Sequence, residues 1–309
     1  MSQRSQDEDF DLANASELRA KLARQIRRLT PTEGDHGTAI PGLQVHRRDT
    51  ATNCYPGTYE PSLTIFAQGQ KRISFGGTSH LCDGATLLLA SVDMPVVSEI
   101  VEATDSVPYL SMTLKLDMAL VREILSHEEL RAGQGPGAGG GLAFGKTPVD
   151  LLEAGSRLLK LMDTPQDIAF LNDLMQREIL YRLLCSPYGQ RLRAIVTTGD
   201  QSYRVAKAIA WLRANYAKQL RVEKLAQVAR MGVSTFHHHF HLLTHMSPLQ
   251  YQKRLRLQVA RQRMLVDGLD AASAAFEVGY ESASQFNREY SRSFGQPPMR
   301  DVRTLREIV

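Results

Sequence analysis

The stretch RVEKLAQVARMGVSTFHHHFHLL, residues 221–243, decides the fold of the C-terminal part of this chain. Leu225, Val228 and Ala229 share one stripe of a short helix, which breaks at Gly232 before a second helix begins. A helix, a tight glycine turn and another helix are typical of a helix-turn-helix unit. The stretch therefore predicts a two-helix corner of the kind found in many DNA-binding domains.

A second copy of this pattern is DAASAAFEVGYESASQFNREYSRSFG, residues 270–295. Asp270 is the expected cap of its first helix, and Gly279 breaks the chain 47 residues after Gly232. Ser282 and Gln285 have the spacing of a capping box at the start of the next helix. A lone two-helix corner often binds no DNA, but two in one segment favour DNA binding strongly.

A basic helix is expected between the two copies, at SPLQYQKRLRLQVARQRML, residues 247–265, with Ser247 as its cap. Residues 201–309 contain 17 Lys/Arg and 8 Asp/Glu, a balance of +9. Residues 1–200 contain 20 and 25, a balance of −5. This asymmetry favours a polyanionic partner for the C-terminal part. The alternative is a merely basic, solvated surface.

The second helix of the first unit has an apolar stripe formed by Phe236, Phe240 and Leu243 when residues are placed 100° apart. Ser234 and Thr235 lie at its N-terminal end, which enters the major groove in this motif. The side left for DNA carries most of the histidines, with one on the flank: His237, His238, His241 and His245. Imidazoles and hydroxyls can hydrogen-bond base edges or phosphates.

The corresponding helix of the second unit directs Phe286 and Tyr290 inward. The side chains expected to be exposed near its start are Ala283, Ser284, Asn287 and Arg288. Asn suits adenine, and Arg suits guanine or phosphate. The alternative for each of these positions is simple solvation.

A metal site is the alternative explanation of the histidine cluster. His237 with His241, and His241 with His245, are i,i+4 pairs that can chelate zinc. A structural zinc site needs four ligands, usually including Cys, and residues 200–309 contain no Cys. We therefore expect no metal here and no cofactor elsewhere in the chain.

The N-terminal part changes in character after a helix expected at residues 16–29, where Ser16 is a possible cap. The apolar period drops to two, with turns at residues 68–69 and 76–77. In YLSMTLKL, residues 109–116, Leu and Met alternate with Ser, Thr and Lys. Short strands at this spacing predict a small barrel or sandwich over about residues 38–117. The whole chain is therefore expected to be α+β.

A Gly-rich loop, GQGPGAGGG at residues 133–141, precedes two leucine-rich helices expected within about residues 148–184. Thr164 is the expected cap of the second helix, and Pro165 suits its first turn. Such helices usually form a packed hairpin. Their apolar excess can serve the barrel or a second subunit, and we expect a homodimer.

Cellular context follows from composition. No apolar run is long enough for a membrane span, and the acidic N-terminus lacks the pattern of a secretion signal. The three cysteines, Cys54, Cys82 and Cys185, form no CxxC pair, which favours a reduced, cytoplasmic setting.

The barrel shows no HxH metal spacing and no recognisable catalytic set, so a small-molecule effector pocket is the default. Cys54 is the one candidate effector-binding residue, as a thiol that could meet an electrophile or oxidant. Cys82 is a weaker candidate of the same kind, and the alternative for both is an inert, packed side chain.

These motifs resemble those of the AraC/XylS family of bacterial transcription regulators. The resemblance rests on LAQVARMGVSTFHHHF, MSPLQYQKRLRLQVARQRML and VGYESASQFNREYSRSFGQPP in the C-terminal part. In the N-terminal part, YEPSLTIFAQGQKRISFGG, SVDMPVVSEIVEA and PYLSMTLKLD resemble the regulatory domain of one branch of the family. The resemblance covers about residues 38–305.

The resemblance implies a cupin-like, effector-sensing and dimerising domain at residues 1–195, followed by a DNA-binding domain at residues 200–309. It implies a nucleoid-associated regulator of double-stranded promoter DNA, an activator rather than a repressor, with RNA polymerase as a further partner. Base contacts carried over by position would come from Ser234, Thr235, His237 and His238, and from Ala283, Ser284, Asn287 and Arg288. His238 stands where the family often has Arg, and Ser291 replaces a common Lys.

Two other classes of protein share parts of this pattern. A cupin-like enzyme fused to a DNA-binding module would need the metal spacing that the barrel lacks. A DNA-repair alkyl acceptor with the same helix-turn-helix domain would need a reactive motif such as Pro-Cys-His-Arg, which the chain lacks. We therefore expect a regulator and not an enzyme.

Overall fold

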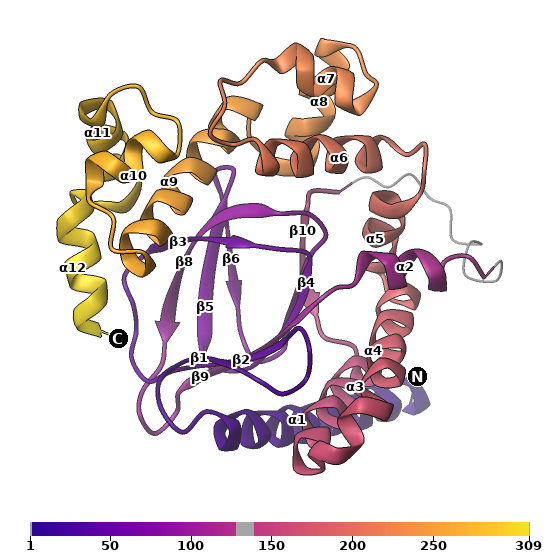
Figure 1. Ribbon diagram of the computed structural model, residues 1–309. Helices are drawn as coiled ribbons and strands as arrows, with labels where there is room; N and C mark the ends of the chain where they lie inside the picture. The colour runs from indigo at the N-terminus through magenta and orange to yellow at the C-terminus, as the bar shows by residue number, and fades with distance from the viewer. Residues whose placement is uncertain (1, 128–138, 309) are drawn as a thin grey trace.

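The computed structural model describes residues 2–127 and 139–308. A two-sheet β domain occupies its centre, with helices below it and the helical C-terminal part above it and to one side (Figure 1). Most of the expected Gly-rich loop, residues 133–138, lies outside the described residues.

The strands form two sheets that face each other and do not close into a barrel. The six-stranded sheet has the order β1-β2-β9-β4-β7-β10, and the four-stranded sheet has the order β3-β8-β5-β6. Every pairing is antiparallel. The strands are β1 (Gly34–Gly37), β2 (Leu43–Arg48), β3 (Tyr55–Tyr59), β4 (Ser62–Gln68), β5 (Gln70–Phe75), β6 (Thr78–Cys82), β7 (Thr86–Ala90), β8 (Met94–Glu102), β9 (Tyr109–Lys115) and β10 (Leu142–Lys146). The two facing sheets correspond to the sandwich that the sequence left open beside a barrel, so the expected cupin-like domain is a pair of sheets and not a closed barrel.

The predicted turns at residues 68–69 and 76–77 are confirmed, because they separate β4 from β5 and β5 from β6. The strand region is wider than the predicted 38–117, since β1 precedes it and β10 follows the Gly-rich segment. β10 pairs with β7 over its full length, Leu142 opposite Ala90 and Lys146 opposite Thr86. Five residues carry too little periodicity to be found by pattern alone.

The alternation in β9 separates a helix-facing side from a cavity-facing side. Leu110, Met112 and Leu114 are buried in the core that includes the helices beneath the six-stranded sheet. Ser111 and Thr113 point instead into the space between the two sheets. The polar side of this strand therefore faces the interior, where a ligand can reach it.

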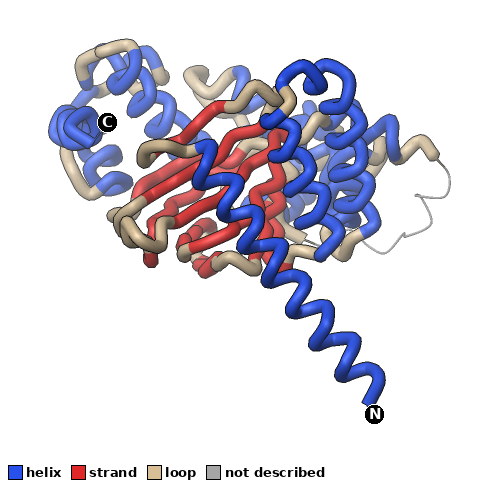
Figure 2. The backbone as a smooth tube through the Cα atoms, turned by 90° about the horizontal axis from the view of Figure 1, so that it is seen from below, coloured by secondary structure: helices blue, strands red, loops and turns tan. Residues whose placement is uncertain are grey.

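Helices cover the outer face of the six-stranded sheet, and α1 crosses it (Figure 2). α1 (Ser2–Leu29) is longer than the expected 16–29, so Ser16 lies inside the helix and does not cap it. Leu22 and Ile26 are fully buried in the core beneath the sheet. A hydrogen bond from the Gln25 side chain to the Ser156 carbonyl oxygen, 3.0 Å long, joins α1 to α3 (Val149–Lys160).

The expected helical hairpin is present. α3 packs against α4 (Ile168–Cys185), and both contribute leucines to the core beneath the sheet. Thr164 makes no capping bond, and the Pro165 turn is a separate 3-10 segment (Pro165–Asp167) that precedes α4. α2 (Met118–Ile124) and α5 (Gly189–Val196) pack beside this hairpin.

The chain after α5 is all-helical, as predicted. Its helices are α6 (Gln201–Ala214), α7 (Val222–Ala229), α8 (Val233–Thr244), α9 (Pro248–Val266), α10 (Ala271–Glu277), α11 (Ala283–Phe294) and α12 (Pro298–Ile308). α6 to α8 and the start of α9 share one buried cluster with the inner side of the β domain. The rest of α9 and α10 to α12 form a separate small core.

Candidate functional site

The first helix-turn-helix unit consists of α7 and α8. Its left-handed turn residue is Arg230, with φ of 53°, whereas Gly232 is extended and caps α8. The predicted break is therefore correct in place, but Arg230 and not the glycine takes the unusual backbone conformation. Phe236 and Phe240 are fully buried on α8, which confirms the predicted inner stripe.

The outer face of α8 carries the side chains that the sequence proposed for DNA. Ser234, Thr235, His237, His238 and His241 are all exposed. They share the helix surface opposite the buried phenylalanines, so nothing within the unit covers them. The face offers two hydroxyls and three imidazoles as hydrogen-bonding groups.

His245 departs from the prediction of an outward histidine. It ends α8 in the left-handed conformation, with φ of 56°, and is half-buried. Its ring lies edge-on to Phe75 of β5, with centroids 5.5 Å apart. The backbone is no longer helical at this C-cap, so a helical wheel does not predict the direction of the side chain. The His245 side chain contacts the β domain rather than solvent.

The second helix-turn-helix unit consists of α10 and α11. Asp270 caps α10 through the N–H groups of residues 272 and 273, as predicted. The Ser282 hydroxyl accepts from the Gln285 N–H, but the Gln285 side chain donates to Glu289, so only half of the predicted capping box forms. Tyr280 donates to the other Glu289 oxygen at 2.9 Å.

The faces of α11 agree with the prediction. Phe286 and Tyr290 are fully buried. Ser284, Asn287 and Arg288 are exposed, and Ala283 is half-buried. An amide and a guanidinium therefore project near the start of this helix, available for base edges or phosphates.

The α9 helix joins the two units, with α7 and α8 on one side and α10 and α11 on the other (Figure 1). Ser247 and Gln250 form a complete capping box at its start. Several of its basic side chains are engaged within the protein. Arg261 binds Asp301 through two hydrogen bonds of 2.8 Å, and Arg256 donates to backbone carbonyls from residues 216 to 218 and at Gly279.

Because of these contacts, the basic residues of α9 indicate a DNA-binding surface less strongly than the sequence suggests. Lys253 also pairs with Glu289 at 3.0 Å. Charges already satisfied inside the domain hold the two helix-turn-helix units together, and the exposed faces of α8 and α11 remain as the candidate nucleic-acid interface.

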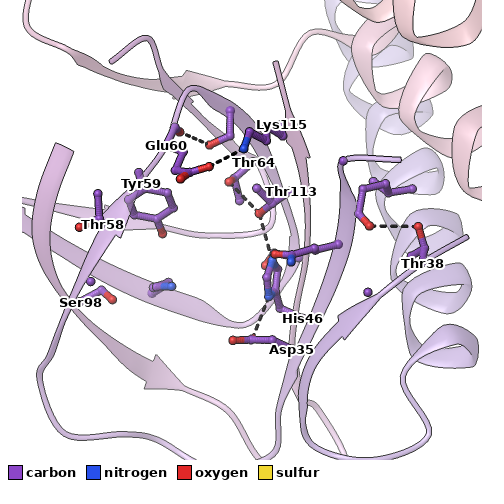
Figure 3. A pocket seen from close by; sticks show the side chains of 18 of the residues that line it. Asp35, Thr38, His46, Thr58, Tyr59, Glu60, Thr64, Ser98, Thr113 and Lys115 are labelled. Carbon is purple, nitrogen blue, oxygen red and sulfur yellow. Dashed lines mark hydrogen bonds and ion pairs between the residues drawn. The ribbon is translucent and has the colours of Figure 1, made fainter. Parts of the chain in front are cut away.

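A cavity of about 640 Å³ lies between the two sheets. Tyr59 and Ser98 come from the four-stranded sheet, and His46, Thr64 and Thr113 come from the six-stranded sheet, facing them across the space (Figure 3). The sequence predicted such a pocket but named none of these residues. A usable signal was Lys71, which is in phase with the buried Ile73 and Phe75 on β5.

A chain of hydrogen bonds runs along one wall of the cavity. His46 contacts Asp35 at 2.8 Å through Nδ1 and Thr113 at 3.1 Å through Nε2, and Thr113 contacts Thr64 at 3.0 Å. Burial opposes ionisation of Asp35, but His46 and Arg48 hold the pKa of this carboxyl well below its usual value. Asp35 is therefore an anion whose charge is already neutralised.

Cys54 is not among the described residues that line the cavity. It is exposed, and its thiol donates to a Glu99 carboxylate oxygen at 3.1 Å. That hydrogen bond, together with partial burial, raises the pKa of the Cys54 thiol. Burial raises the pKa of Cys82 to about 12. Because the thiolate is the reactive form, neither environment activates its cysteine, and the cavity offers other groups for a ligand.

Strand β3 touches both the cavity and the DNA-binding helices. Thr58 and the Gly57 carbonyl oxygen hydrogen-bond with Gln258 of α9. Glu60, directly after β3, pairs with Lys115 and with Arg213 of α6. Glu60, Gly57 and Thr58 all line the cavity.

Two further groups of contacts join the β domain to the C-terminal helices. Arg213 also pairs with Asp93, whose carbonyl oxygen accepts a 2.8 Å hydrogen bond from Tyr251 of α9. At the end of α8, His245 lies beside a stack in which the rings of His80 and Phe144 are 4.3 Å apart.

Among the described residues, no group of three or more His, Cys, Asp or Glu is arranged to hold a metal ion. No helix in residues 2–127 or 139–308 is long and apolar enough to cross a membrane.

Comparison with solved structures supports the fold. ToxT from Vibrio cholerae superposes with a TM-score of 0.56 over 84% of this chain and 97% of that chain, at 10% identity. At this identity the likeness concerns the fold alone.

Comparison with curated sequences gives partial matches. The transcriptional activator RhaS of Yersinia pestis (strain Pestoides F) is 30% identical over 105 residues, 34% of this chain and 38% of that protein. RhaS of Pectobacterium carotovorum is 26% identical over 136 residues, 44% of this chain and 47% of that protein. The chain thus spans less than half the length of these relatives.

Family models account for both parts of the chain. The model of the AraC-type transcriptional regulator N-terminus matches residues 39–191, and a helix-turn-helix domain model matches residues 225–303. The two-sheet domain with its helical hairpin and the paired helix-turn-helix units correspond to these two matches in order. The chain belongs to the AraC/XylS family of transcription regulators, with an AraC-type regulatory domain at its N-terminal side.

Proposed function

We propose that this protein is a sequence-specific DNA-binding transcription regulator that responds to a small-molecule effector. The observation that carries the proposal is the pair of exposed recognition faces on α8 and α11, joined by α9, which packs against both units. Each recognition helix enters one of two successive major-groove segments of double-stranded promoter DNA.

The proposed base and phosphate contacts are the exposed or half-buried side chains of the two faces. On α8 they are Ser234, Thr235, His237, His238 and His241, and on α11 they are Ala283, Ser284, Asn287 and Arg288. Each good base contact contributes about 1–3 kcal/mol of discrimination. Affinity should also fall steeply as salt rises, because phosphate contacts release counterions.

The test combines alanine substitutions at His238, Asn287 and Arg288 and measures protection of a promoter site by footprinting. We expect loss of selective protection, with affinity reduced by about a hundredfold or more. The matched control replaces an exposed His, Asn and Arg that lie off both recognition helices, His127, Asn53 and Arg303. Selective binding that survives the first set of substitutions would contradict the assignment of these residues.

The effector part of the proposal rests on β3, which lines the cavity and also holds α9 through Gln258. A ligand that shifts Tyr59 or Glu60 would bias how the DNA-binding helices sit on the β domain. We assign the effector-sensing and dimerising domain to residues 1–195 and the DNA-binding domain to residues 200–309.

Activation is the proposed direction of control, and it is supported by the RhaS relatives, which are transcriptional activators. An activator would have RNA polymerase as a further partner. Transcription in vitro from a footprinted promoter, with and without this protein, tests the direction. A fall in transcript in the presence of the protein would contradict it.

A further inference from the structure

Lys71 of β5 occupies an unusual position for a lysine. It lies on the inward side of its strand, two residues before the buried Ile73, and it lines the cavity. Its Nζ is 5.5 Å from the ring centre of Tyr55, 5.7 Å from that of Tyr59 and 5.9 Å from that of Tyr109. Three aromatic side chains thus enclose one ammonium group.

The carboxylates that line the cavity are engaged elsewhere. Asp35 pairs with His46 and Arg48, and Glu60 pairs with Lys115 and Arg213. Within the described residues, Lys71 forms no ion pair with a carboxylate. Among the described cations that line the cavity, it is the one without such a pair.

The ammonium nevertheless keeps its charge. Burial would lower the pKa of Lys71, but the surrounding Tyr59, Tyr109 and Tyr55, with a hydrogen bond that the ammonium donates to the Tyr55 hydroxyl oxygen, raise it well above the ordinary value. The three tyrosines offer ring faces and hydroxyl dipoles but no full negative charge. A bound anion would supply the missing partner.

The side chains in the rest of the cavity indicate the chemistry of the ligand beyond its charged group. Hydroxyl groups line both sheets around Lys71: Thr58, Thr64, Ser98, Ser111 and Thr113. Hydroxyl groups both donate and accept hydrogen bonds, so they match a ligand that carries hydroxyls of its own. Most of these hydroxyls already hydrogen-bond to protein groups. A hydroxyl can donate one hydrogen bond and accept two, so each keeps capacity that a ligand hydroxyl can use and a long apolar chain cannot.

We propose that the cavity binds a small polyhydroxylated carboxylate, with the carboxylate on Lys71 and the hydroxyl groups on the Ser and Thr side chains of the two sheets. This inference rests on the proposed effector response and names the chemical class of the effector. Tyr55 and Tyr59 belong to β3, so a ligand on Lys71 would contact the strand that holds α9.

The test is isothermal titration of the full-length protein at constant ionic strength. The probes are gluconate and glucuronate as hydroxylated acids, glucitol as an uncharged polyol, and hexanoate as an acid without hydroxyls. We expect at least one hydroxylated acid to bind at least about tenfold more tightly than glucitol and hexanoate. Equal or tighter binding of glucitol or hexanoate would overturn the proposal, as would no binding of either hydroxylated acid.

Variants of Lys71 test whether its ammonium group binds the carboxylate of the ligand. Lys71→Met should weaken binding of the hydroxylated acid by about tenfold or more, and Lys71→Arg should restore part of it. Lys160→Met, at an exposed lysine of α3, is the control and should bind as the wild type does. Unchanged binding by a folded Lys71→Met would overturn the proposal. The probe comparison on the wild type stands even where that variant does not fold.

Promoter footprinting on the same samples separates this inference from the proposed function. Promoter protection without binding of either acid overturns the ligand class and leaves the regulator intact. Acid binding without any promoter protection contradicts the regulator.

Discussion

Gly279 is the glycine on which the second helix-turn-helix unit depends. Its φ of 87° is left-handed, and a Cβ there would overlap the Ala217 carbonyl oxygen. Arg256 donates to the carbonyl oxygens of both residues, at 2.9 and 3.0 Å. We expect Gly279→Ala to lower the free energy of unfolding by about 3 kcal/mol or more, because backbone strain and overlap add.

Gly295 provides the matched control for this prediction. Its φ is 75°, but nothing lies within 4 Å of a Cβ built there. Gly295→Ala should therefore lower the free energy of unfolding only by about 1–2 kcal/mol, from backbone strain alone. Urea denaturation of the two variants measures the difference, and equal losses would show that the contact with Ala217 does not matter.

The histidines of α8 predict a pH dependence of DNA binding. Imidazole loses its positive charge as pH rises through neutrality, and phosphates favour the charged form. DNA affinity should therefore weaken between about pH 6 and 8 by more than it does for a His237→Gln/His238→Arg variant. Fluorescence anisotropy with one labelled promoter fragment measures both profiles. Parallel profiles would count against histidine contacts with DNA.

At the residue scale, the sequence predicts buried faces well and helix ends poorly. A wheel places Phe236 and Phe286 correctly, because helical geometry fixes their direction. The wheel does not apply at the C-cap, which is why His245 turns toward Phe75. Lys71 was missed because its neighbours in space, Tyr55 and Tyr109, are distant in sequence.

The α4 helix carries an exposed apolar stripe. Phe170, Leu174 and Tyr181 fall within about 40° of one another on a helical wheel, and Phe170 is 80% exposed. Solvent contact of such a stripe is unfavourable, so we propose that a second copy of the chain covers it. Leu174→Asp should convert a dimer to a monomer, as measured by analytical ultracentrifugation.

Val266→Asp is the control for this prediction, because Val266 is also an exposed apolar residue but lies at the end of α9. It should leave the molecular mass in solution unchanged. A wild type that sediments as a monomer would contradict the dimer itself, and dimerisation of Leu174→Asp would remove α4 from the interface.

At the element scale, the paired helix-turn-helix units and most strands were predictable, because each has its own periodicity and turn residues. β10 was not, since it is short and its partner β7 lies across the Gly-rich segment. The basic character of α9 was predictable, but the contacts that its basic side chains form within the domain were not. Asp301, which binds Arg261, belongs to another helix that pattern analysis does not bring near.

For the whole molecule, the contact between α8 and the β domain is expected to weaken in acid. Burial lowers the pKa of His80. Burial, together with repulsion from His241, Arg191 and His80 whenever these groups are charged, lowers that of His245. Both imidazoles are thus held neutral while the surfaces touch. The separated state binds more protons, so the contact is stable above the ordinary histidine pKa, about 6.5, and is lost as pH falls below it.

Hydrogen exchange measured at about pH 7.5 and 5.5, corrected for intrinsic rates, tests this expectation. Exchange in residues 70–82 and 241–247 should increase at the lower pH more than exchange in β9 does. His80→Phe keeps a ring against Phe144 without a titrating group and should show a smaller increase. An increase of the same size in this variant would remove His80 from the explanation.

At this scale the sequence predicted two parts with different roles but not how they meet. The contacts of β3 with α9 join residues about 200 positions apart, and local periodicity carries no information about such pairs. The double sheet in place of a closed barrel has the same origin, because strand order is set by long-range pairing.

The proposed effector response, together with the dual position of β3, would make the promoter itself a determinant of sensitivity. Coupling between two sites is reciprocal: the factor by which an occupied cavity changes affinity for DNA is the factor by which DNA changes affinity for the ligand. Molecules seated on a promoter and molecules free in solution then have different thresholds for the same metabolite. Two promoters that displace Gln258 and β3 to different extents would make the same protein respond at two different ligand concentrations.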